Sequence, residues 1–75
     1  MREKKIRLGA ADVTEFVKAA ETCDFDVDIS YDRVVIDAKS IVGVFSMDLS
    51  KVLTVKYGGQ NPEFENLLQK FAIAS

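Results

Sequence analysis

Three carboxylates at alternating positions are the most suggestive chemical groups in this 75-residue sequence: Asp24, Asp26 and Asp28. Carboxylates at this spacing open the calcium-binding loop of an EF-hand, which needs a glycine at its sixth position and a glutamate at its twelfth. Here those positions hold Ile29 and Val35. Apolar residues also alternate with the carboxylates, which is typical of a strand with one buried and one solvated face. We therefore expect a strand at this place and no metal site.

The sequence contains no histidine and a single cysteine, Cys23. Catalysis by a Ser–His or Cys–His pair is excluded, because no imidazole is present to act as the base. A zinc site and an internal disulfide are likewise not expected, and Cys23 is predicted to be a small buried side chain. Gly58 and Gly59 lack a following Lys-Ser or Lys-Thr, so they indicate a turn and not a phosphate-binding loop. We expect no cofactor.

Ser40 stands where a β-branched strand pattern ends and an apolar helical pattern begins, within the stretch from Ala38 to Leu49. A short hydroxyl at this position is a natural helix N-cap, because it can accept a hydrogen bond from a free N–H group of the first turn. The apolar residues that follow are Ile41, Val42, Val44, Phe45 and Met47. At 3.6 residues per turn they cannot all face one side, so about half should form an exposed apolar surface of the kind that binds partners.

The remaining elements follow from the spacing of apolar residues. Strands are expected over residues 4–8, 25–31, 34–38 and 52–57, and helices over 13–22, 40–48 and 62–72. Asp32 and Arg33 form a two-residue hairpin turn, although such turns prefer Gly or Asn where Arg33 stands. Asn61 and Pro62 begin the last helix as its cap and its first residue. The economical fold is α+β, with a four-stranded, mainly antiparallel sheet and three helices on one face, in a single domain over residues 1–75.

The start of the first helix has two alternatives. Asp12 and Glu15 form a D-x-x-E capping box, which favours a start at Val13. A start at Ala10 would instead make Gly9 the N-cap residue. The single sequence leaves this choice open.

The composition is that of an ordinary cytoplasmic protein. The net charge is −2, and 48% of the residues are hydrophobic and 29% charged. No cluster of basic residues indicates nucleic-acid binding. No apolar run has the length of a signal peptide or a membrane span, so neither export nor membrane attachment is expected.

The string from Lys39 to Ser46, KSIVGVFS, resembles the regulatory-serine helix of HPr, the phosphocarrier of the bacterial sugar phosphotransferase system. The resemblance runs from about Gly9 to about Leu49 without a gap, and then with short deletions to the C-terminus. It implies an open-faced β-sandwich of order β-α-β-β-α-β-α. It fails at the family's active-site signature, a histidine followed by x-R-P-A. That signature should fall on a loop that here reads Gly9, Ala10, Ala11 and Asp12, so both the histidine and the arginine are missing.

The resemblance also implies a regulatory site and a partner-binding surface. Ser40 matches the serine that HPr kinase phosphorylates. By the same resemblance, Ile41, Val42 and Phe45 match the family's partner-binding surface. The full set of residues that we expect to contact partners is Lys39, Ile41, Val42, Phe45 and Met47. The partners that it implies are proteins: an HPr kinase, enzymes of the phosphotransferase system and transcriptional regulators.

These features lead to three hypotheses. The first is a regulatory or protein-interaction module that is not an enzyme, acts through residues 40–49 and carries Ser40 as a phosphorylation site. The second is a phosphocarrier in which Asp12 forms an acyl phosphate, although it falls three positions late and Ala11 replaces the arginine. The third is a scaffold that pairs weakly with a second copy through its apolar surface.

Overall fold

The computed structural model describes residues 1–73 and has the predicted order of elements, β-α-β-β-α-β-α. The strands are β1 (Arg2–Ile6), β2 (Val27–Tyr31), β3 (Val34–Asp37) and β4 (Leu53–Tyr57). The helices are α1 (Val13–Glu21), α2 (Ile41–Phe45) and α3 (Pro62–Phe71), and a 3-10 turn at Ala10–Asp12 precedes α1. Among the described helices, none is long and apolar enough to cross a membrane.

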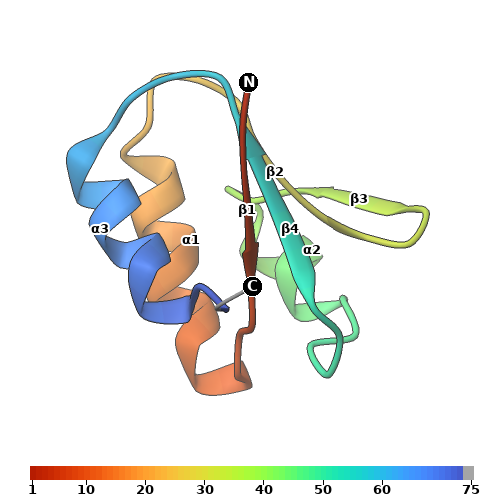
Figure 1. Ribbon diagram of the computed structural model, residues 1–75. Coiled ribbons are helices and arrows are strands. Elements are labelled where there is room, and N and C mark those ends of the chain that lie inside the picture. The colour runs from red at the N-terminus through yellow and green to blue at the C-terminus, as the bar shows by residue number, and fades with distance from the viewer. Residues whose placement is uncertain (74–75) are drawn as a thin grey trace.

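The four strands form one sheet in the order β1-β4-β2-β3, and every neighbouring pair is antiparallel. Figure 1 shows α1 and α3 side by side on the same face of this sheet. The opposite face carries a row of charged residues, with Glu3 opposite Lys56 and Lys56 opposite Asp28. The predicted α+β class and open-faced sandwich are therefore confirmed.

One hydrophobic core lies between the sheet and the helices. Its centre is aromatic: the ring of Phe64 lies 6.1 Å from that of Phe16 and 5.5 Å from that of Tyr57. Burial raises the pKa of the Tyr57 hydroxyl, and the nearby Glu65 carboxylate raises it further. Cys23 is buried in the same core, as predicted.

The first strand begins and ends earlier than residues 4–8. β1 pairs with β4 from Arg2 opposite Tyr57 to Ile6 opposite Leu53, so it ends where β4 begins. Arg2 also lies 2.7 Å from Glu65 of α3, which holds the charged N-terminal end of the strand against the last helix.

The turn between β2 and β3 is a two-residue hairpin, as predicted, and Asp32 has a positive φ of 49°. Arg33 has no positive φ, so the strained position is Asp32, and aspartate tolerates this region better than most residues.

The prediction that Asp12 and Glu15 form a D-x-x-E capping box at the start of α1 is wrong. The Asp12 carboxylate does not cap α1 but accepts a hydrogen bond of 2.9 Å from the N–H of Gly9. Glu15 instead pairs with Lys70 of α3. Both alternative starts are therefore partly present: a 3-10 turn begins at Ala10, and the α-helix begins at Val13.

Candidate protein-interaction surface

Ser40 is the N-cap of α2, as the sequence predicts. Its backbone is extended, with φ of −98° and ψ of 106°, and its hydroxyl oxygen accepts a hydrogen bond of 3.1 Å from the N–H of Gly43. The Ser40 N–H in turn donates to the carbonyl of Asp37 at the end of β3. The side chain is exposed, so the hydroxyl caps the helix without being enclosed by it.

Three apolar side chains of α2 are exposed to solvent, in agreement with the expectation that about half would be. Val42 is 77% exposed, Phe45 49% and Ile41 40%. Val44 is completely buried and attaches the helix to the core. We call the three exposed residues, Ile41, Val42 and Phe45, the α2 surface.

Met47, a predicted partner-binding residue, is only 6% exposed and belongs to the core. The prediction assumed a helix over residues 40–48, but α2 ends at Phe45. The N–H of Ser46 donates to the carbonyls of both Val42 and Gly43, and its hydroxyl donates to that of Gly43 at 2.6 Å. Because the helix stops there, the helical period no longer decides where Met47 points, and it is not part of the α2 surface.

Gly43 allows α2 to lie unusually close to β3. A Cβ atom at this position would lie 2.7 Å from Cγ2 of Ile36 and 3.1 Å from Oγ of Ser40. Real Cβ atoms do not approach other carbons so closely, and a γ-carbon next to a branch point has little freedom to move. The glycine thus fixes the distance between the helix and the strand under it.

Lys39, another predicted partner-binding residue, has a structural role. Its ammonium group donates a hydrogen bond of 3.0 Å to the carbonyl of Cys23, just after α1, and its backbone N–H donates to the Asp37 carboxylate at 2.9 Å. Burial raises the pKa of the neighbouring Cys23 thiol, while a hydrogen bond from Asn61 and the charge of Lys39 partly offset this effect. Lys39 therefore ties the loop before α2 to the end of α1.

The loop that corresponds to the family's active-site signature lies at the start of α1. Gly9, Ala10 and Ala11 are exposed, and Asp12 is half-buried with its carboxylate bonded to Gly9. In the described part of the chain, no ion pair involves Asp12.

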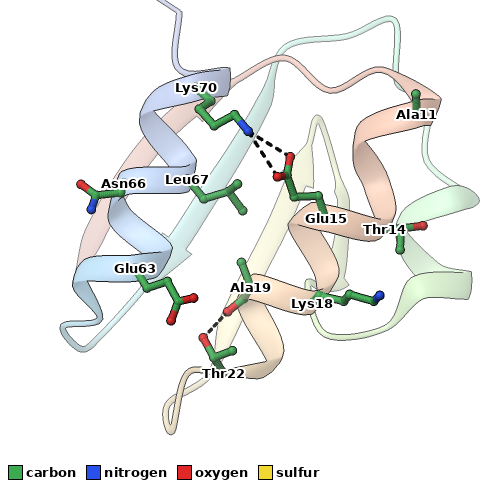
Figure 2. A pocket seen from close by; sticks show the side chains of 10 residues that line it. All are labelled: Ala11, Thr14, Glu15, Lys18, Ala19, Thr22, Glu63, Asn66, Leu67 and Lys70. Carbon is green, nitrogen blue, oxygen red and sulfur yellow. Dashed lines mark hydrogen bonds and ion pairs between the residues drawn. The ribbon is translucent and has the colours of Figure 1, made fainter.

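Two surface features were not found from the sequence. An open groove of about 700 Å³ lies between α1 and α3, and the ion pair of Glu15 and Lys70, 3.2 Å apart, crosses it in Figure 2. On β3, Val35 is 63% exposed. The groove joins residues 55 positions apart in the chain, which no local pattern indicates. The exposure of Val35 could have been read from the alternation along the strand.

Comparisons with known proteins place the fold. No family model matches the chain, and no curated protein matches it. Among solved structures, HPr-C-His from Thermoanaerobacter tengcongensis is similar, with 23% identity, 93% of each chain covered and a TM-score of 0.76. The phosphocarrier protein HPr from Bacillus anthracis str. Ames is similar as well, with 24% identity, 93% of this chain and 95% of the other covered, and a TM-score of 0.72. This chain therefore has the fold of the HPr phosphocarrier proteins.

Proposed function

We propose that this chain is a regulatory protein-interaction module of the HPr type that is not an enzyme, and that it binds protein partners through the α2 surface. The observation that carries the proposal is the exposure of Ile41, Val42 and Phe45 on a helix that Val44 already holds in the core. Full burial of an aliphatic or aromatic side chain is worth about 1.5–3 kcal/mol. A partner that covers these three side chains gains a substantial driving force without unfolding any part of the module.

The absence of histidine supports a role without phosphoryl transfer to sugars. The family's signature loop offers Gly9, Ala10 and Ala11, which carry no nucleophilic side chain. Asp12 does carry a carboxylate, but it is bonded to the Gly9 N–H. The proposed partners are an HPr kinase, enzymes of the phosphotransferase system or transcriptional regulators.

We further propose Ser40 as the regulatory phosphorylation site of this module. A phosphoryl group adds about two negative charges and three acceptor oxygens. Its oxygens can keep the hydrogen bond from the Gly43 N–H, which the Ser40 hydroxyl accepts at 3.1 Å. The added charge would lie beside Ile41, so it favours partners with basic side chains around their apolar contact and disfavours purely apolar ones.

An NMR titration tests the surface. The amide signals of Ile41, Val42 and Phe45 should shift when a true partner is added, while those of Val35 on the far face of the sheet should not. Val42→Glu should abolish binding, and Val35→Glu, the same change at an exposed valine on the far face of the sheet, serves as the matched control. If no candidate partner shifts the three amides, the proposed surface is wrong.

The intact mass of the protein after incubation with ATP and an HPr kinase tests the proposed phosphorylation of Ser40. We expect one added phosphoryl group on the parent protein and none on Ser40→Ala. If the kinase modifies ordinary HPr but not this chain, Ser40 is only a helix cap. A phosphoryl group that is acquired from phosphoenolpyruvate and the donor enzyme, and that hydroxylamine removes, would instead identify a carrier that uses Asp12.

A further inference from the structure

The two edges of the sheet are protected differently. On the outer side of β1 the chain returns after α3: the N–H of Arg7 donates to the carbonyl of Phe71 at 3.0 Å, and the N–H of Ile73 donates to that of Lys5 at 3.1 Å. At the other edge, the sheet of the described residues ends at β3. Figure 1 shows the β2–β3 hairpin projecting away from α1 and α3, so these helices do not cover this edge.

The backbone groups that β3 offers at this edge follow from its register. Tyr31 pairs with Val34 across the two-residue turn, and Ile29 pairs with Ile36. Since hydrogen-bonded and non-bonded pairs alternate along an antiparallel ladder, Val34 and Ile36 use their backbone groups toward β2. The backbone groups of Val35 and Asp37 therefore point outward, and one of them, the Asp37 carbonyl, already accepts from the Ser40 N–H.

The side chains of this edge are apolar in the middle and charged at the ends. Val35 is 63% exposed and Val34 38%. Arg33 precedes the strand and Asp37 ends it, and both are exposed. Among the described residues, neither of the two forms an ion pair. An exposed strand edge with this composition is a template for pairing with another strand.

We infer that β3 pairs antiparallel with β3 of a second copy of this chain, with Val35 on the two-fold axis. In this register Val35 faces Val35 of the second copy, and their outward backbone groups bond to each other. The same register places Arg33 beside Asp37 of the second copy. By the two-fold symmetry, Asp37 also lies beside Arg33 of the second copy, so the interface contains two oppositely charged pairs. The two sheets then continue into one sheet of about eight strands, from the four of each copy.

Other registers lose this complementarity. A shift by two residues sets Val35 opposite Asp37 and leaves Arg33 beyond the end of the partner strand. A shift by one residue sets the outward backbone groups of one copy opposite residues of the other copy whose backbone groups already bond to β2. It also places side chains from opposite faces of the two sheets next to each other. The charges therefore select the register with Val35 on the axis. This contact uses β3 and not the α2 surface, so the two surfaces are tested independently.

Sedimentation equilibrium of the full chain from micromolar to millimolar concentration tests the inference, together with charge variants. We expect a monomer–dimer equilibrium for the parent protein. Arg33→Asp should weaken the dimer about tenfold, because two symmetry-related attractive pairs become repulsive. Arg33→Asp combined with Asp37→Arg should restore the dimer, because the exchanged charges again complement each other.

Asp37 also accepts a hydrogen bond from the Lys39 N–H, so the double variant is accompanied by two measurements that leave Asp37 in place. Val35→Lys should abolish the dimer, and Val42→Glu should leave it unchanged. In a mixed sample of labelled and unlabelled parent protein, the Hα atoms of Val34 and Ile36 should show an intermolecular NOE, because they form the close non-bonded pair of this register. A protein that is monomeric at millimolar concentration, or a dimer lost in Val42→Glu but kept in Val35→Lys, would overturn the inference.

Discussion

Replacing Gly43 by alanine tests the tight contact between α2 and β3, because two effects of opposite sign compete at this position. Alanine is favoured over glycine inside a helix by about 1 kcal/mol. The new Cβ, however, would lie 2.7 Å from Cγ2 of Ile36. Overpacking of this kind costs about 1–3 kcal/mol. We expect the clash to win, with a net loss of about 1 kcal/mol in the free energy of unfolding.

Urea unfolding followed by circular dichroism measures this loss. With a urea m-value of about 1 kcal/mol/M for a small protein, the midpoint should fall by about 1 M. The melting temperature should fall by roughly 4–8 °C. An exposed helical glycine would behave in the opposite way, so a variant that is more stable than the parent would refute the argument from the contact.

A double-mutant cycle separates the clash from other effects of the substitution. Ile36→Ala removes the Cγ2 atom, so in that background Gly43→Ala should stabilise the protein by up to about 1 kcal/mol. The coupling between the two sites should then be about 2 kcal/mol, which is well above the additivity error of distant sites. A coupling near zero would mean that the helix moves away from β3 without cost.

Three further changes test other parts of the structure. Ser40→Ala should lower the free energy of unfolding by about 1 kcal/mol in urea, because the Gly43 N–H loses its acceptor. Gly59→Ala should cost about 1–3 kcal/mol, because the new Cβ would overlap the ring of Phe25, and thermal unfolding will show it. Burial raises the pKa of Cys23 above its ordinary value of 9.0, so the unfolded state loses the thiol proton first. The resulting stabilisation is complete below pH 9 and declines as the pH rises through the folded pKa, so urea midpoints of the parent should fall more than those of Cys23→Ala between pH 8 and pH 10.5.

The sequence was sufficient for the architecture, because each element carries its own local signal. Asn61 accepts the predicted capping bond from the N–H of Phe64, and Pro62 begins α3 as expected. Phe64 and Leu68, four positions apart on α3, are both completely buried. These features depend on residues within one or two turns of each other, which a single sequence displays directly.

The errors occurred where distant contacts or side-chain hydrogen bonds decide the local structure. α2 ends next to Ser46, whose hydroxyl and N–H both donate hydrogen bonds to carbonyls of the preceding turn. The N–H of Asp48 donates to the hydroxyl of Tyr31, which draws the chain toward β2 after the helix. Met47 is consequently buried although a continuous helix was expected to expose it. A further contact that no local pattern shows is the hydrogen bond from the Lys39 ammonium group to the carbonyl of Cys23.

The way in which α2 is attached explains how so short a helix can expose apolar side chains. Isolated helices of this length do not form in water, so packing and capping must supply the stability of α2. The close approach of Gly43 to Ile36 and the burial of Val44 hold the inner side of the helix on the core, and the Ser40 cap stabilises its first turn. None of these contacts involves Val42, which is 77% exposed. A charge at Val42 should therefore change the free energy of unfolding by no more than about 0.5 kcal/mol.

This separation gives the proposed function its physical basis. Residues that fix α2 on the sheet and residues that would meet a partner lie on opposite sides of the same turn, so the outer side can change with little effect on the fold. Ser40 is the exception, because its hydroxyl caps the helix and is also exposed. The proposed modification at Ser40 would therefore act on a side chain that both caps α2 and is exposed to solvent.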